Sequence, residues 1–222
     1  LELVFTYEWN SSEKFGFIRH SKIKNLSNIV SQVRVLDGIQ NILPYGVEQA
    51  LQNSTSNLVD AYKKCELEED FGLGIYSLSA IIVDKAEPSE ALKANTVYSV
   101  GLNSPIRLIS SLQLESFRLG NIVKEERDIR AEKGAYFLVD EIQIASNSED
   151  KWSIVANVNQ SMKDIVNITE SLKNPDNLKN QIHESIEKGT QELISLVAGA
   201  DGIQLSQDKT RNVRHFANTM FN

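Results

Sequence analysis

The sequence predicts an antiparallel β-sandwich followed by helices, and three observations lead to this prediction. Apolar and polar residues alternate in short segments through the first two thirds of the chain, which is the period of strands with one buried face. These segments follow one another without the regularly spaced helices that connect the strands of a parallel sheet. After Val158 the apolar residues recur every three or four positions, which indicates amphipathic helices. We therefore expect a sandwich domain at residues 1–158 and a helical region at 159–222.

About eight segments of the sandwich domain fit the strand pattern. In the first, the alternating residues from Leu3 to Trp9 are expected to turn one face toward the core, so Trp9 is interpreted as a core residue. The third is expected to end in a turn at Asp37 and Gly38. The segments are Leu3–Trp9, Lys14–Ile23, a strand through Val33 and Val35, Leu73–Asp84, Leu92–Leu102, Arg107–Phe117, Ala135–Ala145 and Trp152–Val158.

One helix is expected to interrupt the strands, between Val47 and Cys65. Its apolar residues recur at spacings of three and four, and its position after Pro44-Tyr45-Gly46 suggests a crossover packed against a sheet. Tyr62 and Cys65 lie on its apolar side, so both are expected to be packing residues. The acidic run from Glu66 to Asp70 is interpreted as the solvated end of this helix.

The helical region is expected to contain three helices. Ser161 and Asp164 have the spacing of a capping box at the start of the first. Asn174 and Pro175 then provide a cap and a first helical residue for the second. A third amphipathic segment, Val213 to Phe221, exposes apolar surface, and we expect this surface to make the chain prone to self-association.

Composition and charge exclude several functions. The 23 Lys and Arg residues against 30 Asp and Glu residues give a net charge of −7, and no local basic patch interrupts it, so nucleic acid is not an expected partner. The apolar runs are far shorter than the roughly 20 residues that span a bilayer, so no membrane partner is expected. One cysteine excludes an internal disulfide, and the three histidines lie far apart with no paired spacing, so neither a metal nor a cofactor is expected.

The strongest candidates for ligand contact lie in one short stretch. Sugars are bound by aromatic faces and by planar amide or carboxylate groups, and Asp37, Gln40, Asn41 and Tyr45 provide this mixture within nine residues. The alternative is that these polar groups satisfy the backbone of a loop and that Asp37 makes a turn.

Two kinds of carbohydrate chemistry would each need particular residues. An inverting glycosidic reaction needs a general acid near the leaving oxygen, and Asp37 and Asp60 are the better carboxylates for this role. An aldose epimerase would need a histidine with a carboxylate, and His20 has no partner that the sequence identifies. No residue of the chain is therefore assigned as catalytic.

The stretches Gly16–Ser21, Ile23–Ser27 and Val35–Gly46 resemble the non-catalytic sandwich domain of large bacterial carbohydrate-active proteins related to cellobiose phosphorylase. The resemblance extends to "VDAYKK" at residues 59–64, "AEPSEALKANTVYSVGL" at 86–102 and "RHFANTMFN" at 214–222. It implies a galactose-mutarotase-like supersandwich and a helical linker that leads to an (α/α) barrel absent from this chain.

This resemblance also implies a function. The first residue is Leu1 rather than Met, which suggests a piece of a longer protein whose barrel supplies the general acid. The chain alone is then expected to be inactive, to support the barrel, and to lend the segment from Asp37 to Tyr45 to the sugar site of a glycoside hydrolase or phosphorylase. The alternative is a stand-alone module that binds a protein or a carbohydrate.

Overall fold

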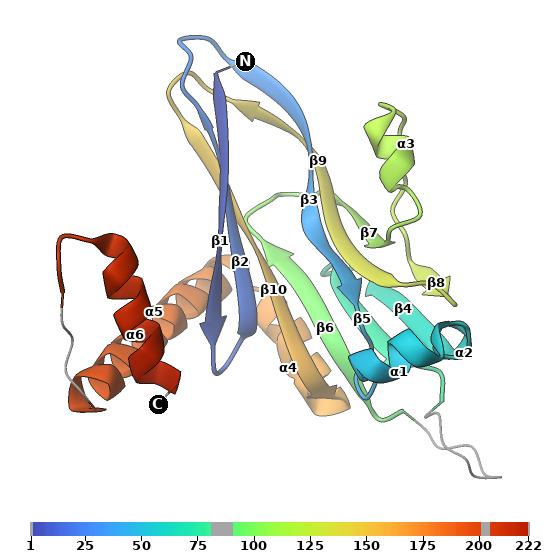
Figure 1. The fold of residues 1–222 in the computed structure, drawn as a ribbon. Coiled ribbons are helices and arrows are strands. Elements are labelled where there is room, and N and C mark those ends of the chain that lie inside the picture. Colours follow the sequence, from blue (N-terminus) through green and yellow to red (C-terminus); the bar gives the residue numbers. More distant parts are fainter. Residues whose placement is uncertain (1, 81–90, 201–204, 222) are drawn as a thin grey trace.

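Two antiparallel sheets lie face to face in the computed structural model, which describes residues 2–80, 91–200 and 205–221 (Figure 1). The larger sheet has seven strands in the order β1-β2-β10-β6-β5-β4-β8. Its strands are β1 (Leu3–Ser12), β2 (Gly16–Asn25), β10 (Glu149–Ser161), β6 (Lys93–Val100), β5 (Leu73–Leu78), β4 (Lys63–Glu68) and β8 (Asp128–Arg130). The predicted mixture of antiparallel strands and helices is confirmed.

The smaller sheet has three strands in the order β3-β9-β7. Its strands are β3 (Ser31–Ile42), β9 (Gly134–Ile144) and β7 (Ile106–Ser110). The chain passes from the larger sheet to the smaller one between β2 and β3 and back between β9 and β10, and both crossings lie at the end where Ser31 pairs with Ile144. β3 forms one edge of the smaller sheet and lies opposite β2 and β10 of the larger one (Figure 1).

The main hydrophobic core lies between the two sheets. Its largest member is Trp152 of β10, which is 1% exposed, and it packs with Tyr76 of β5 and Tyr136 of β9. Burial raises the pKa of both tyrosines, and each hydroxyl donates to a backbone carbonyl: Tyr76 to Ala135 at 2.5 Å and Tyr136 to Gly72 at 2.7 Å. The hydroxyl groups of these two buried tyrosines therefore have hydrogen-bond partners, as buried polar groups usually do.

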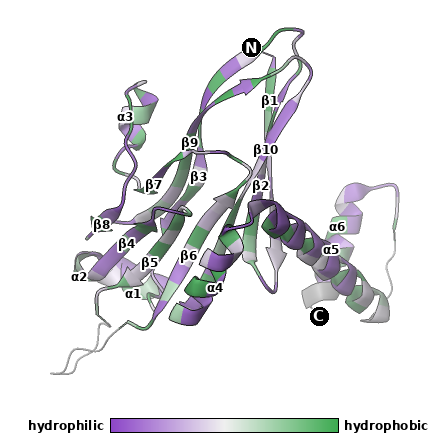
Figure 2. Cartoon of the chain, turned by 180° about the vertical axis from the view of Figure 1, so that it is seen from behind, coloured by the Kyte–Doolittle hydropathy of each residue, from purple (hydrophilic) through white to green (hydrophobic). Residues whose placement is uncertain are grey.

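Helices cover the outer face of the larger sheet. α4 (Met162–Leu172) begins at the predicted capping box, since the Ser161 side chain accepts from the backbone of Asp164 and the Asp164 carboxylate accepts from Ser161. α5 (Pro175–Ala200) begins at the predicted proline and packs its first half on the sheet, seen from behind in Figure 2. The remaining helices are α1 (Gln49–Ser54), α2 (Ser56–Tyr62), α3 (Leu114–Arg118) and α6 (Lys209–Phe221).

Two predicted elements differ in type from the structure. The helix expected from Val47 to Cys65 is two short helices that meet at Thr55, and Cys65 lies in β4, where alternate residues are buried. The strand expected at Arg107–Phe117 ends at Ser110 and is followed by α3. Both errors arise because a short apolar run fits either period, so that packing against the rest of the fold decides the outcome.

Two strands extend beyond the expected limits. β3 does not turn at Asp37 but continues to Ile42, and β10 continues to Ser161, past the change of period at Val158. Of the strand predicted at Leu73–Asp84, residues 81–84 lie outside the described residues.

Candidate functional site

The first strand carries aromatic side chains that are exposed rather than buried. Phe5, Tyr7 and Trp9 are 43%, 58% and 51% exposed, so the expectation that this face of β1 belongs to the core is wrong. The reason is the position of β1 at the edge of the seven-stranded sheet, beyond the three-stranded sheet that covers the neighbouring strands (Figure 1). An exposed aromatic cluster of this kind in a folded protein indicates a contact surface.

An open groove of about 700 Å³ runs between this aromatic face and the edge strand β3. Strand pairing places its aromatic walls together, because Trp9 pairs with Arg19 on β2 and Arg19 follows Phe17 by two residues on the same face. Phe17 is 56% exposed. The lining residues are Tyr7, Trp9, Phe17, Arg19, Gly38, Ile39, Gln40, Asn41, Ile42 and Ala156.

A β-bulge puts Asn41 at the lip of the groove. The pairing of β3 with β9 shifts between Gln40 and Ile42, so Asn41 has no pairing partner, and its φ of 57° lies in the left-handed region. Asparagine tolerates this region better than most residues. A bulge re-aims side chains, and here it lets the Asn41 amide contribute to two neighbouring hollows.

A buried polar network centred on Asp37 reaches the groove through Arg19. The Asp37 carboxylate accepts from the Arg19 guanidinium, from the hydroxyl of Ser21 at 2.6 Å, and from Nε1 of Trp152 at 2.8 Å. Asp37 is 6% exposed and lies within β3, where it pairs with Leu138, so the expectation that it makes a turn is wrong. Arg19 also lies 4.2 Å from the ring centre of Tyr7, so the network fixes an aromatic side chain that lines the groove.

Beyond Asn41 lies a second hollow, about 470 Å³ in volume and rich in amides. The Gln52 side chain is buried, and its Oε1 atom has no hydrogen-bond partner among the described residues, so an acceptor is available there. The Gln52 amide donates to Asp60, which also accepts from Lys63 at 2.7 Å. Burial alone would raise the pKa of Asp60, but these hydrogen bonds and the charges of Lys63 and Lys133 lower it overall. Its lining residues are Asn41, Ile42, Leu43, Gln49, Gln52, Asn53, Ser56, Lys63 and Lys133.

The four candidate residues from the sequence therefore have different positions. Gln40 and Asn41 line the groove, whereas Asp37 lies beneath it. Tyr45 lines neither hollow, and its ring is 5.4 Å from the ammonium group of Lys93. The sequence pattern missed Tyr7 and Phe17, because alternation identifies a strand but not whether the opposing sheet covers it.

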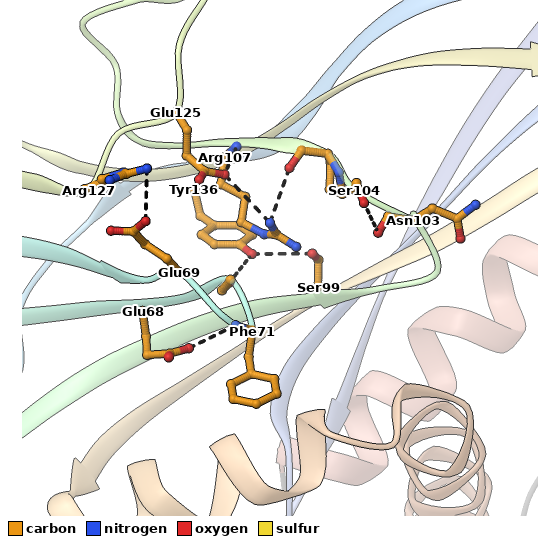
Figure 3. Close-up of polar contacts among 12 residues, drawn as sticks. Glu68, Glu69, Phe71, Ser99, Asn103, Ser104, Arg107, Glu125, Arg127 and Tyr136 are labelled. Carbon is orange, nitrogen blue, oxygen red and sulfur yellow. Dashed lines mark hydrogen bonds and ion pairs between the residues drawn. The ribbon is translucent and has the colours of Figure 1, made fainter.

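A different polar cluster joins the turn between β4 and β5 to the smaller sheet (Figure 3). Glu68 accepts from the backbone of Phe71, and Glu69 pairs with Arg127 at 3.1 Å. The acidic run is thus the end of a strand and its turn, and the interpretation as a helix end is wrong. Arg107 lies against Gly72, where a Cβ atom would be only 2.0 Å from its Nε. This packing locks the turn, and we assign the cluster a structural role.

The described part of the chain was searched for a reactive thiol, for metal ligands and for a membrane-spanning helix. Burial raises the pKa of Cys65 to about 12, with smaller effects from nearby charges, which suits the packing role expected for it. Within the described ranges no group of three or more His, Cys, Asp or Glu side chains is arranged to hold a metal ion. Nor does any helix there have the length and apolar character to cross a membrane.

No family model matches the chain, and no curated protein matches it either.

Proposed function

We propose that this chain is the non-catalytic sandwich and linker region of a large carbohydrate-active protein related to cellobiose phosphorylase. In this proposal the sandwich is a galactose-mutarotase-like supersandwich, and the parent protein is a glycoside hydrolase or phosphorylase whose (α/α) barrel carries the general acid. The groove between β1 and β3 holds part of the carbohydrate.

The observation that carries the proposal is the composition of the groove. Tyr7, Trp9 and Phe17 offer exposed ring faces to the C–H surface of a sugar, and the amides of Gln40 and Asn41 stand at the opposite wall to meet its hydroxyls. The adjoining hollow adds further amide groups and the acceptor on Gln52. The aromatic groove continues into the amide-rich hollow, and this arrangement suits a polar ligand longer than one sugar ring.

The carboxylates near the groove favour a supporting role over catalysis. Its lining contains neither Asp nor Glu, and Asp37 beneath it is buried and held by Arg19, Ser21 and Trp152. Inverting hydrolysis uses two carboxyl groups on opposite faces of the sugar, at a separation of roughly 6.5–9.5 Å, whereas phosphorolysis needs a general acid and uses phosphate as the nucleophile. A second protein segment must provide these acidic groups if the groove serves either reaction.

Calorimetry with a panel of β- and α-linked gluco-oligosaccharides tests the proposal. We expect saturable binding that Trp9→Ala weakens by about two- to tenfold, the loss of one stacking contact. Tyr45→Ala is the matched control, because Tyr45 is also a half-exposed aromatic residue but lies outside the groove. Equal effects of the two substitutions would contradict the proposed groove.

Activity assays separate the supporting role from an enzyme. The chain incubated with disaccharides, with and without phosphate, is expected to give no turnover, and measurable turnover would show that it carries the chemistry itself. A stand-alone interaction module is the remaining candidate, favoured by the exposure of Val213 on α6 at 68%. Concentration-dependent sedimentation of the chain without any oligosaccharide binding would support that candidate and the expected self-association.

A further inference from the structure

A second cleft, of about 680 Å³, lies between α5 and the outer face of the larger sheet. Because successive residues of a strand point to opposite faces, Glu8 and His20 lie on the side opposite Trp9 and Arg19 of the groove. The cleft therefore opens on the other side of the sheet from the proposed carbohydrate groove, and Tyr7 is the residue that lines both. Figure 2 shows α5 lying across this side of the sheet.

Packing and hydrogen bonds fix α5 over the sheet, so the cleft is part of the folded structure. Leu178 and Ile182 of α5 are at most 2% exposed and pack against the sheet. Ser185 is hydrogen-bonded to Ser12 at 2.6 Å. Lys14 donates to Gln181 at 2.8 Å.

Nitrogen groups from both walls meet in this cleft. Lys179 and His183 come from α5 and His20 comes from β2, and both α5 groups act electrostatically on His20. Nδ1 of His20 is 2.6 Å from the hydroxyl of Ser153, and Nε2 has no hydrogen-bond partner among the described residues. Burial lowers the pKa of His20, His183 and Lys179 lower it further, and Glu8 opposes this.

The other charges of the cleft fall into two groups. Lys22 and Lys151 line it but are already paired with Glu149, at 3.8 Å and 2.6 Å. Glu8 and Glu187 also line it, and within the described ranges neither makes an ion pair. Lys179 likewise makes no ion pair there. The cleft thus contains one ammonium group and two carboxylates without ion pairs to the described residues, and one oxygen of Glu8 also accepts from the Asn10 amide at 3.4 Å.

We infer that this cleft binds a small hydroxylated anion, with its phosphate or carboxylate group on Lys179, His183 and His20 and its hydroxyl groups donating to Glu8 and Glu187. Charge-assisted hydrogen bonds to lysine and histidine hold the anionic group, and carboxylates are strong acceptors for hydroxyl donors. The volume of the cleft is within the usual range for a small-molecule site, about 300–1,000 Å³.

Histidine-ring NMR of the whole chain, titrated with glycerol 3-phosphate, inorganic phosphate and glycerol, tests the inference. We expect saturable shifts of the His20 and His183 signals with glycerol 3-phosphate, while the signal of His215 on α6 stays in place. Inorganic phosphate is expected to bind more weakly and glycerol not to bind. The bound anion also favours the protonated form of His20, so its titration should move to higher pH.

Three substitutions at exposed positions of α5 test the named contacts, and one of them, Lys188→Gln, is the control. Lys179→Gln is expected to weaken glycerol 3-phosphate binding by about tenfold or more, as the loss of a charge-assisted contact predicts. Lys188→Gln removes an equally charged side chain of the same helix that does not line the cleft, and should leave the affinity unchanged. Glu187→Gln should weaken glycerol 3-phosphate without weakening inorganic phosphate.

The inference is overturned if glycerol 3-phosphate gives no saturable shift, or if Lys179→Gln and Lys188→Gln behave alike. Equal binding of glycerol and glycerol 3-phosphate would also overturn it, because the anionic group would then play no part. Oligosaccharide binding in the groove is tested separately by Trp9→Ala, because Trp9 lines the groove but not the cleft, whereas Lys179 lines only the cleft.

Discussion

Replacing Asp37 by Asn tests whether the buried network beneath the groove holds the two sheets together. Asparagine keeps the size of the side chain and one acceptor oxygen but removes the charge that faces Arg19. The Arg19 side chain is 9% exposed, so its guanidinium would stay buried without a counter-charge. Breaking a buried pair in this way typically costs 3–5 kcal/mol, and we expect Asp37→Asn to lower the free energy of unfolding by about 3 kcal/mol.

The assay is urea unfolding followed by tryptophan fluorescence, which reports on the buried Trp152 that donates to Asp37. Asp128→Asn is the matched control, because its pair with Arg130 is exposed and its loss should leave the unfolding midpoint unchanged. Adding Arg19→Met to Asp37→Asn should recover part of the stability, since no uncompensated charge then remains. A loss below about 1 kcal/mol for Asp37→Asn, as for an exposed pair, would refute the reasoning.

Three further predictions concern other parts of the fold. Gly38→Ala should destabilise the chain by more than about 1 kcal/mol, because its Cβ would be 2.1 Å from the carbonyl oxygen of Tyr136. Gly189→Ala in the open middle of α5 should instead stabilise it by up to about 1 kcal/mol. Urea midpoints equal to that of the unsubstituted chain would contradict both predictions. Cys65 should not react with a thiol reagent at pH 8 until the chain is unfolded, and rapid reaction of the native chain would contradict its burial. The lowered pKa of His20 means that the unfolded chain binds this proton more readily, so stability should fall as the pH decreases below 6.5, and less so in His20→Gln; identical pH profiles would contradict this.

Local signals were enough to predict the helical region. A capping box at Ser161 and a proline after Asn174 act within a few residues, and α4 and α5 begin where these signals place them. Alternation also predicts most of the strands, but it misses β4 and β8 and extends β7 past its end. Cys65 was assigned to the wrong element, because three or four apolar residues fit both periods and only packing against the neighbouring strands distinguishes them.

The candidate sites depend on contacts that a sequence pattern does not contain. Trp9 was expected in the core because alternation shows that a strand has two faces, whereas sheet width decides which face is covered. Gln40 and Asn41 were found from their residue types, but the bulge that exposes Asn41 depends on its register with β9. His20 and His183, far apart in sequence, come close because α5 returns across the strand that carries His20.

The most direct test of the carbohydrate groove is an NMR titration that observes the two tryptophan indole N–H groups. Trp9 lines the groove, while Trp152 is buried and bonded to Asp37, so the two signals distinguish ligand contact from a change in the core. We expect a gluco-oligosaccharide that binds the chain to shift the Trp9 signal saturably and to shift the Trp152 signal much less. We also expect Asn41→Ala to reduce the affinity of the chain for that oligosaccharide. An unchanged Trp9 signal throughout the titration would contradict the proposed groove.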